Sequence, residues 1–312
     1  MSHLPNRADR PFLTDGGIET TLIFQMGFDL PCFASYPLLD SEGGREALRS
    51  YYRNHMEIAE RRNMGFVLES PTWRCSPDWG AQLGHSPDEI ARFNRDAILL
   101  MEELQVGSAS NAPIVISGNI GPRGDGYKAE TMMTAQAARD YHAFQIGVFA
   151  EMDVDVVTAI TMTHSGEAAG VALAAKSAGI PCVIGFTTET DGRLPSGETL
   201  AEAISAVDTV TDAGPIYYMI NCAHPDHFVD ALPGGRLAAR IRGIRANASR
   251  QSHAELDDAE NLDRGDPHEL AQNYAVLRQH LPNLTVFGGC CGTDHHHIGC
   301  IADAITASNA AA

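Results

Sequence analysis

The stretch Leu284-Thr285-Val286-Phe287-Gly288-Gly289-Cys290-Cys291-Gly292-Thr293 joins a short apolar run to a glycine-rich string that carries two adjacent cysteines. The apolar run, Leu284–Phe287, contains the β-branched and aromatic residues typical of a strand. Neighbouring residues of a regular strand point to opposite faces, but the flanking glycines let the backbone bend so that both cysteines can face one point. The stretch therefore predicts a strand followed directly by a functional loop.

The same unit, an apolar run followed by a polar or glycine-rich string, recurs along the chain. The predicted strands are Pro11–Asp15, Phe66–Glu69, Pro113–Ser117, Val154–Ala159, Pro181–Phe186, Ile216–Ile220, Ile241–Arg245 and Leu284–Phe287. The helical segments between them include Glu46–Asn63, Asp88–Leu104, Ala135–Met152, Gly166–Ser177 and Leu200–Thr211. Strands that alternate with helices indicate parallel βαβ units, and eight such units favour a barrel over an open sheet. We predict an α/β fold, a (β/α)₈ TIM barrel forming a single domain over residues 1–312.

Each predicted strand but one runs into an unusual string of residues. The strings are Asp15-Gly16-Gly17-Ile18-Glu19-Thr20, Glu69-Ser70-Pro71-Thr72-Trp73, Ser117-Gly118-Asn119-Ile120-Gly121-Pro122, Thr187-Thr188-Glu189, Asn221-Cys222-Ala223-His224-Pro225, Arg245-Ala246-Asn247 and the Cys290-Cys291 string. In a barrel, all of them follow the carboxyl ends of strands and gather around one mouth, where barrel enzymes place their chemistry. This arrangement brings Cys222, after the sixth strand, near Cys290 and Cys291, after the eighth.

Three converging thiols suit a soft divalent metal. Zinc binds thiolates readily, and three protein ligands leave a fourth tetrahedral position for substrate, as in catalytic sites. An accidental or redox-active cysteine pair is the alternative. The remaining cysteines are interpreted as small buried apolar side chains; they are Cys32, Cys75, Cys182 and Cys300. The run His295-His296-His297 is expected at the start of the last helix, with His297 in the helix and the others solvated.

Composition narrows the class of protein. The 312 residues carry a formal net charge of −18, which argues against binding to nucleic acid or to anionic membrane surfaces. No apolar run approaches the roughly 20 residues of a membrane span, and the first ten residues lack the apolar core of a signal peptide. Seven cysteines, an odd number, fit a reducing compartment. We therefore expect a cytoplasmic protein whose partners are small molecules.

The joint pattern resembles the zinc-dependent homocysteine S-methyltransferase family, which includes betaine–homocysteine and S-methylmethionine–homocysteine methyltransferases and the homocysteine domain of methionine synthase. The resemblance runs from residue 13 to about residue 298. The matching pieces are Asp15-Gly16-Gly17, Ser117-Gly118-Asn119-Ile120-Gly121-Pro122, Gly185-Phe186-Thr187 with Gly197, Asn221-Cys222 with Pro225, and Gly288-Gly289-Cys290-Cys291-Gly292-Thr293.

This resemblance implies a (β/α)₈ barrel with Zn²⁺ held by Cys222, Cys290 and Cys291. It also implies transfer of a methyl group from a donor to the zinc-bound thiolate of homocysteine, which yields methionine. A free thiol is mostly protonated at neutral pH, and metal binding supplies the nucleophilic thiolate. Because members that use folate or cobalamin carry additional domains, we expect a small onium donor such as S-methylmethionine.

Substrate contacts are expected around the mouth, at Asp15, Gly16, Glu69, Trp73, Asn119, Thr161 and Asn247, with Asp15 and Glu69 as the catalytic pair. Asp15 matches an acidic residue that faces substrate in the family, although Asp-Gly-Gly is also ordinary turn chemistry. Trp73, where the family usually has tyrosine, offers an aromatic face to a cation; Trp79 follows in the same segment, and Tyr127 is expected in the loop after the third strand. Simple packing is the alternative role for Trp73.

One departure from the family bears on the acceptor. The family usually has Glu-Thr after the fourth strand, placed to bind the acceptor's amino group, whereas this chain has Ile160-Thr161. Glu69 ends the second strand, where the family usually has threonine. We hypothesise that Glu69 replaces the missing charge; the alternatives are that Glu69 bonds locally to backbone, and that the acceptor is another small thiol.

Two other classes of function are less well supported. A zinc hydrolase on this fold usually has histidine and carboxylate ligands, often His-x-His on the first strand, where this chain has Asp15-Gly16-Gly17. A zinc store or sensor has no need of an open metal position. The polar segment from about Pro233 to Asp266 is expected to be either an excursion between strands or part of a homo-oligomer contact.

Overall fold

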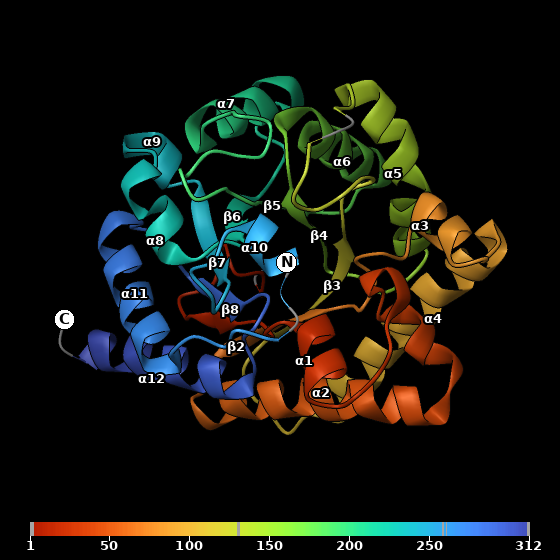
Figure 1. Ribbon diagram of the computed structural model, residues 1–312, viewed down its shortest axis with the longest axis horizontal. Helices are drawn as coiled ribbons and strands as arrows, with labels where there is room; N and C mark the ends of the chain where they lie inside the picture. Colours follow the sequence, from red (N-terminus) through yellow and green to blue (C-terminus); the bar gives the residue numbers. More distant parts are fainter. Residues whose placement is uncertain (1–2, 130–131, 258, 260, 311–312) are drawn as a thin grey trace.

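The computed structural model describes residues 3–129, 132–257, 259 and 261–310. Eight parallel strands form a closed barrel in the order of the sequence, and the last strand pairs with the first (Figure 1). The strands are β1 (Phe12–Leu13), β2 (Gly65–Glu69), β3 (Ile114–Ile120), β4 (Val156–Met162), β5 (Cys182–Phe186), β6 (Tyr217–Asn221), β7 (Ile241–Ala246) and β8 (Val286–Gly289). The structure confirms the predicted TIM barrel.

All eight predicted strands are confirmed, but five of them (β3, β4, β6, β7 and β8) run beyond their predicted carboxyl ends, β3 and β4 the furthest. β3 continues to Ile120 and β4 to Met162, so Asn119 and Thr161, expected in loops, lie within strands. Pairing with the neighbouring strands accounts for the extension of β3, since Asn119 and Ile120 pair with Thr158 and Ala159. Glycine and polar residues are uncommon in strands, so their presence near the ends of these strands led the sequence to predict ends that are too early.

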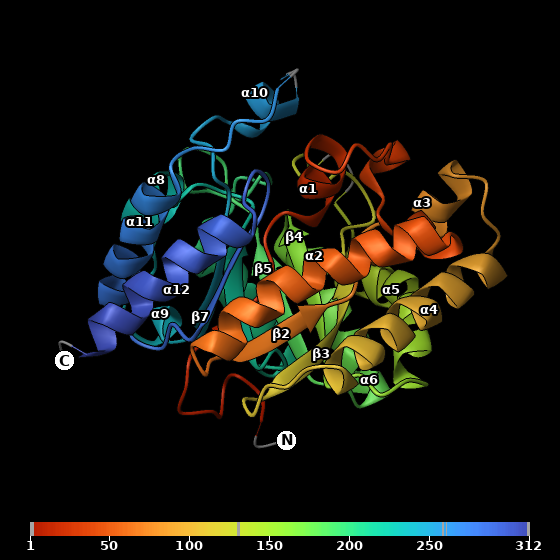
Figure 2. The ribbon, with the colours of Figure 1, turned by 90° about the horizontal axis from the view of Figure 1, so that it is seen from below.

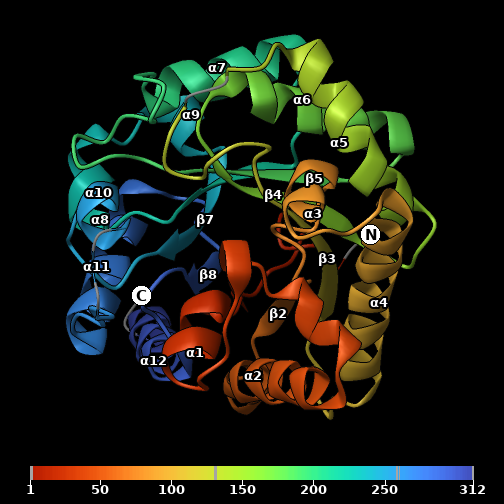
Figure 3. The same ribbon diagram turned by 45° about the vertical axis from the view of Figure 1, so that its right-hand side comes forward.

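Helices surround the barrel (Figures 1 and 3). The longer ones are α2 (Glu42–Arg61), α4 (Pro87–Val106), α5 (Ala135–Ala150), α6 (Ser165–Ala178), α7 (Leu200–Thr211), α11 (Pro267–His280) and α12 (His295–Ala310). The shorter ones are α1 (Ile18–Phe24), α3 (Pro77–Gln82), α8 (Pro225–Phe228), α9 (Gly235–Ala238), α10 (His253–Asp257) and the 3₁₀ turns Pro31–Phe33, Tyr36–Asp40 and Val229–Ala231. α12 packs against α2, which closes the outer ring where the barrel closes.

Local sequence accounts for where these helices begin. Ser86 and Thr199 start α4 and α7 with capping boxes, in which Glu89 and Glu202 bond back to the cap backbone. The five predicted helices are confirmed, with ends that differ by up to four residues.

The barrel interior is apolar towards its amino-terminal end. Its buried cluster is made of side chains from the strands together with Leu4; the members are Leu4, Phe12, Val67, Val115, Val156, Ile160, Val183, Tyr217, Met219 and Val286. A second and larger apolar cluster lies between the strands and the surrounding helices. The amino-terminal segment lies at this end of the barrel, where His3 contacts Asp155 at 2.8 Å (Figure 2). Apolar side chains therefore fill the amino-terminal end of the barrel, and a pocket inside the barrel can form only at the carboxyl ends of the strands.

The opposite end of the barrel carries α1 and α10 (Figure 2). Between β7 and α11, the described residues 247–257, 259 and 261–266 include α10, and Leu256, Leu262 and Asp263 among them line the pocket at the mouth. The described part of the polar segment from Pro233 to Asp266 thus includes β7 and contributes to one side of the mouth, and its predicted alternative role in an oligomer contact stays a prediction. Within the described residues, no helix is long and apolar enough to cross a membrane.

Close packing between β3 and α5 gives a direct test of this architecture. A Cβ at Gly118 would lie 2.6 Å from Cδ2 of Phe149, a buried side chain of α5. We expect Gly118→Ala to lower the free energy of unfolding by about 1–3 kcal/mol, because the core must shift to admit the methyl group. Urea denaturation measures the change.

Gly147→Ala is the matched control, since Gly147 lies in α5 and a Cβ there meets nothing within 4 Å. It should leave stability unchanged or raise it by up to about 1 kcal/mol through helix propensity. Equal effects of the two substitutions would contradict the described packing of β3 on α5.

Candidate active site

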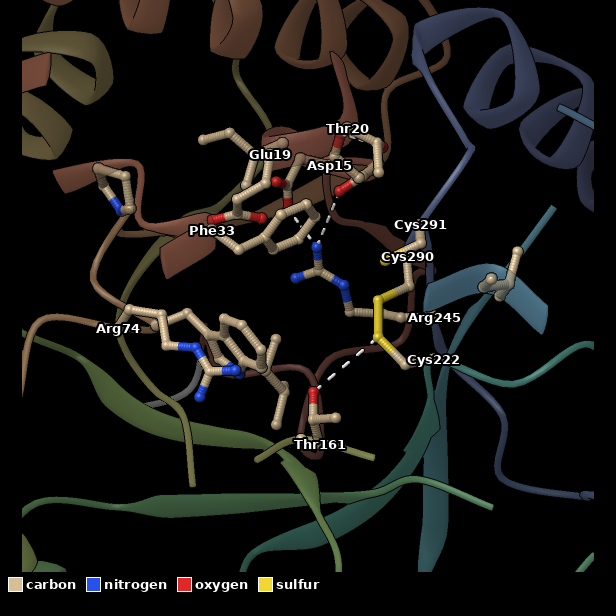
Figure 4. Close-up of a pocket in the computed structure, with 18 of the residues that line it drawn as sticks. Asp15, Glu19, Thr20, Phe33, Arg74, Thr161, Cys222, Arg245, Cys290 and Cys291 are labelled. Carbon is tan, nitrogen blue, oxygen red and sulfur yellow. Dashed lines mark hydrogen bonds and ion pairs between the residues drawn. A yellow bond between two sulfur atoms is a disulfide. The ribbon is translucent and has the colours of Figure 1, made fainter. Parts of the chain in front are cut away.

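A pocket lies at the carboxyl ends of the strands, where the sequence predicted the mouth. The predicted site residues that line it are Asp15, Gly16, Glu69, Trp73, Asn119, Thr161, Cys222, Cys290 and Cys291 (Figure 4). Asn247, the one predicted contact that does not line it, is buried beside the pocket, and its amide N–H donates to the carbonyl of Ala223. The barrel thus brings together residues separated by more than 270 positions.

The thiol cluster consists of Cys222, after β6, with Cys290 and Cys291, after β8. Their three sulfur atoms lie within 4.8 Å of one another, and no histidine or carboxylate of the described residues joins them. The structure joins Cys222 to Cys290 as a disulfide across 68 residues of sequence, whereas the sequence predicted three thiolates. Reduction of this disulfide yields a three-thiolate donor set with one side facing the pocket, which fits the requirement of a catalytic zinc site.

Glycines shape the loop that carries two of these cysteines. A Cβ at Gly289 would overlap the hydroxyl oxygen of Thr293, and Gly292 has a φ of +79°, a conformation that L side chains rarely adopt. The Thr293 hydroxyl donates to the carbonyl of Cys290 at 2.7 Å, which closes the loop on itself. The bend predicted from the sequence at Cys290-Cys291 is therefore present.

Two residues beside the thiol cluster have an unusual backbone. Thr161 and Cys222 have φ values of 63° and 54°, which are uncommon for residues other than glycine. Asn221 stabilises this geometry: its Oδ1 accepts from the Thr161 amide at 2.9 Å, and its Nδ2 donates to the Thr161 hydroxyl at 3.0 Å. The Thr161 hydroxyl lies 3.9 Å from Sγ of Cys222 (Figure 4). Sequence reasoning missed this role of Asn221, because it depends on a bulge in β4.

The loop over the mouth also contacts the thiol cluster. His253 of α10 bonds through Nε2 to the carbonyl of Cys222 at 2.7 Å, and its ring stacks on Tyr127 with centroids 3.9 Å apart. The Tyr127 hydroxyl lies 3.4 Å from Sγ of Cys291. Tyr127, expected as an aromatic of the mouth, thus touches a candidate metal ligand, whereas His253 had no signal in the sequence beyond its residue type.

Arg245 lies in the centre of the pocket. Its Nη2 donates to Oδ1 of Asp15 at 2.8 Å, and Tyr51 donates to the other oxygen of Asp15 at 2.9 Å. Arg245 is 4% exposed, and its Nη1 has no hydrogen-bond partner among the described residues. In Figure 4 the guanidinium lies between Asp15 and the cysteines. Asp15 is therefore already paired, and the free donor of this pair is Nη1 of Arg245.

Glu69 lies next to this ion pair. Its Oε1 is 3.8 Å from Nη1 of Arg245, and the Ser117 hydroxyl donates to Oε2 at 3.2 Å. Burial raises the pKa of Glu69 to about 7, although Arg245 opposes the shift. The side chain lines the pocket, and among the described residues its hydrogen bond comes from the hydroxyl of Ser117 on the neighbouring strand rather than from local backbone. Ile160, where the resemblance predicted a carboxylate, belongs to the apolar interior cluster and also lines the pocket.

Trp73 and Trp79 enclose an arginine. The guanidinium carbon of Arg74 lies 4.0 Å from the ring centroid of Trp73 and 3.7 Å from that of Trp79. The Trp79 indole donates to the carbonyl of Pro122 at 3.3 Å, and only Trp73 of the two lines the pocket. A cation of the protein itself therefore occupies one aromatic surface on which the sequence predicted an onium group.

The remaining sequence predictions have mixed outcomes. Cys75 and Cys182 are buried as expected, but Cys32 and Cys300 are partly exposed. Helix α12 begins at His295, earlier than expected; His295 and His296 are exposed, and His297 is buried against Asp294. A histidine is not part of the thiol cluster in the described chain.

The family model of homocysteine S-methyltransferases matches residues 12–305. The chain therefore belongs to the homocysteine S-methyltransferase family. Homocysteine S-methyltransferase 3 of Arabidopsis thaliana is 23% identical over 216 residues, which cover 66% of this chain. The match spans 61% of the length of that plant protein.

Solved structures show the same fold. The homocysteine methyltransferase MmuM of Escherichia coli in its oxidized form has a TM-score of 0.75 at 15% identity, with 98% of each chain covered. Its metallated form has the same TM-score and identity, with 96% of this chain and 99% of that chain covered.

The raised pKa of Glu69 gives a measurable dependence of stability on pH. Because the folded pKa of about 7 exceeds the ordinary 4.5, ionising Glu69 costs stability, and the cost grows as pH rises from about 4.5 through 7. We expect the stability of Glu69→Gln relative to the unmodified protein to rise by on the order of 2–3 kcal/mol from pH 5 to pH 8 in urea denaturation.

Glu202→Gln is the control of opposite sign. Hydrogen bonds from the backbone and the hydroxyl of Thr199 lower the pKa of Glu202 below its ordinary value. The stability that this carboxylate contributes is therefore nearly constant above pH 5, and the difference from the unmodified protein should stay flat. A flat difference for Glu69→Gln as well would contradict the described burial of Glu69.

Proposed function

We propose that this member of the homocysteine S-methyltransferase family transfers a methyl group from a small onium donor to the thiolate of homocysteine, giving methionine, with Zn²⁺ held by Cys222, Cys290 and Cys291. The observation that carries the proposal is the convergence of three sulfur atoms within 4.8 Å on the pocket side of the barrel. When bound, zinc would lower the pKa of the acceptor thiol at its open position and so supply a thiolate at neutral pH. The Escherichia coli homocysteine methyltransferase MmuM, which has the same fold, has been solved in a metallated form, which is consistent with a metal in this proposal.

Recognition of homocysteine requires groups for its amino and carboxylate ends. We assign the ammonium to Glu69, whose buried carboxylate lines the pocket where Ile160 offers no charge. The neighbouring Nη1 of Arg245, which lies 3.8 Å from Oε1 of Glu69 and has no hydrogen-bond partner among the described residues, is suited to the carboxylate. An amino acid that carries both charges then neutralises both groups at once, which offsets the cost of burying them. Asp15 acts through Arg245, which it orients.

The methyl transfer step balances without a further reactant. The acceptor thiolate attacks the methyl carbon in line and forms the new carbon–sulfur bond, while the bond from that carbon to the donor sulfonium or ammonium breaks. The electron pair of that bond stays with the donor, which leaves as a neutral sulfide or amine, and the thiol proton passes to solvent. Holding both groups near attack distance is the contribution of the pocket walls. The carboxylate of Asp125, which lines the pocket, favours a cationic donor.

A second candidate is the same transfer to a different small thiol. It is favoured by Ile160, which is buried in the apolar cluster at the position of the family's acceptor-binding carboxylate. Gly16, Asn119 and Thr161 line the pocket and could contact either acceptor. Asn247 is buried and does not line the pocket, so it would act only by supporting residues that do. Both candidate functions are zinc-dependent transfers of a methyl group to a thiolate, and they differ only in which thiol accepts it.

A methyl-transfer assay tests the function. Reduced, zinc-loaded protein is offered homocysteine with S-methylmethionine, S-adenosylmethionine, dimethylsulfoniopropionate or betaine, and methionine is followed by mass. We expect methionine from at least one donor and a loss of at least about 10³-fold in Cys290→Ala, because one metal ligand is missing. Cys182→Ala, in β5 and outside the pocket, is the control that should keep its activity. Methionine formed equally by Cys290→Ala would contradict the assignment.

The role of Glu69 gives a second expectation. Glu69→Gln should raise the KM for homocysteine by at least about tenfold, because one charge-assisted bond to the acceptor ammonium is lost. The KM for the donor should change little. An unchanged KM for homocysteine would remove Glu69 from acceptor recognition and favour the second candidate.

A further inference from the structure

Three side chains that commonly bind transition metals lie together outside the pocket. They are His268 of α11 with His296 and Cys300 of α12. One ligand atom of each lies within 4.8 Å of those of the other two. The two histidines are exposed, Cys300 is partly exposed, and none of the three lines the pocket at the mouth. The group is therefore separate from the thiol cluster and open to ions from solvent.

Two helices supply the three side chains. His296 and Cys300 are four residues apart in α12, so they lie on one face of that helix, one turn apart. His268 lies in the first turn of α11, which packs against α12 on the outside of the barrel (Figures 1 and 2). The rings of His268 and His296 have centroids 6.2 Å apart and planes at 87°. An ion held by all three side chains therefore links the two helices.

The ligand atoms are available to an ion. The backbone amides of His268 and His296 donate to Oδ1 of Asp266 and of Asp294, at 2.8 and 3.0 Å, which fixes the backbone at the start of each helix. In the described chain, the ring nitrogens of both histidines and the Cys300 thiol have no hydrogen bond or ion pair. A tetrahedral zinc ion holds such donors about 3.5 Å apart, so side-chain rotation must close the widest gap by at most about 1.3 Å.

The surrounding charge favours a cation. The carboxylates of Asp303, Asp266 and Asp294 act on the Cys300 thiol, with Arg62 as the opposing cation. Arg62 already donates to Asp303 at 2.8 Å, which reduces its effect on an ion nearby. Imidazole and thiolate are ligands for zinc and its neighbours in the periodic table, whereas Mg²⁺ and Ca²⁺ take oxygen ligands. The ligand set and the charge together select a borderline-soft divalent cation.

An ion here would act beside the active site. α11 and α12 each follow a segment that contributes to the mouth, since Asp263 and Cys291 line the pocket. The two segments are already connected: Arg264 pairs with Asp294, and Nε2 of His297 donates to the carbonyl of Arg264 at 2.9 Å. A metal between the first turns of α11 and α12 adds a further link at the same place.

We propose that His268, His296 and Cys300 bind one Zn²⁺, which clamps the first turns of α11 and α12 together. Three protein ligands and one water complete the tetrahedron, because the site faces solvent. The thiol proton of Cys300 passes to solvent when the ion binds. The clamp holds the two segments that precede these helices in place at the mouth. It is independent of the proposed methyl transfer, since it uses none of the residues of that reaction.

Calorimetric titration with Zn²⁺ counts the sites. The reduced, metal-free protein should bind two equivalents. A background variant with Cys222→Ala and Cys290→Ala, which leaves one thiol in the thiol cluster, should bind one equivalent. Mg²⁺ should bind to neither protein at the same concentration. The remaining equivalent in the background variant isolates the proposed second site from the catalytic one.

Further substitutions in the background variant assign that equivalent. His268→Ala, His296→Ala and Cys300→Ala should each weaken Zn²⁺ binding at least tenfold. His280→Ala is the matched control, because His280 is also an exposed histidine of α11 but lies at its other end. Zn²⁺ should raise the urea midpoint of the background variant, since the ion binds only the folded helix pair, and each ligand substitution should abolish the rise. Circular dichroism checks that each variant is folded.

The outcomes separate the clamp from the methyl transfer. Absence of Zn²⁺ binding in the background variant, or binding that His296→Ala and Cys300→Ala leave unchanged, overturns the second site. A loss in His296→Ala with no effect of His268→Ala places the ion on α12 alone and overturns the clamp. Zn²⁺ binding that all three ligand substitutions weaken, together with the raised urea midpoint, supports the clamp even if no thiol is methylated.

Discussion

Closure of the barrel between β8 and β1 is the constraint on which the site depends. Phe12 pairs with Val286, and the loop after β1 then lies against the loop after β8, where a Cβ at Gly17 would be 2.5 Å from the carbonyl oxygen of Cys290. Pairing of β6 with β7 and of β7 with β8 brings Cys222 to Cys290 and Cys291. An open sheet with the same strands would separate Asp15 from the cysteines by its full width.

The mouth concentrates charge above an apolar interior. Below it, side chains such as Phe12 and Val115 fill the barrel, whereas Asp15, Glu69 and Arg245 are buried just above them. Such groups are costly to bury and give stability only as a satisfied set. Arg245 with a free Nη1, together with Arg74 between two indoles, leaves this set incomplete within the described chain. Buried charged groups that lack a hydrogen-bonded partner are what a site for charged substrates requires, because the substrate then supplies the missing partner.

Much of the fold and the thiol cluster could be predicted from the sequence, because both follow from local patterns and one topological rule. Short β-rich runs located all eight strands, and parallel topology placed Cys222 near Cys290. The partners of the charged residues could not be predicted. Arg245 pairs with Asp15 across 230 residues, and the strained Thr161 depends on Asn221 of another strand. The position of Arg74 between the rings of Trp73 and Trp79 likewise depends on how the segment after β2 folds.

The central claim is that Cys222, Cys290 and Cys291 hold a metal whose open position accepts a thiol. Cobalt in place of zinc in the reduced Cys300→Ala variant, which lacks the thiol of the second proposed metal site, gives the most direct test, since its absorption reports the number of bound thiolates. The account predicts one equivalent of bound cobalt with thiolate bands, a further change on addition of homocysteine or another acceptor thiol, and loss of the bands in Cys222→Ala. Thiolate bands that persist in Cys222→Ala, or a spectrum that no thiol alters, would contradict it.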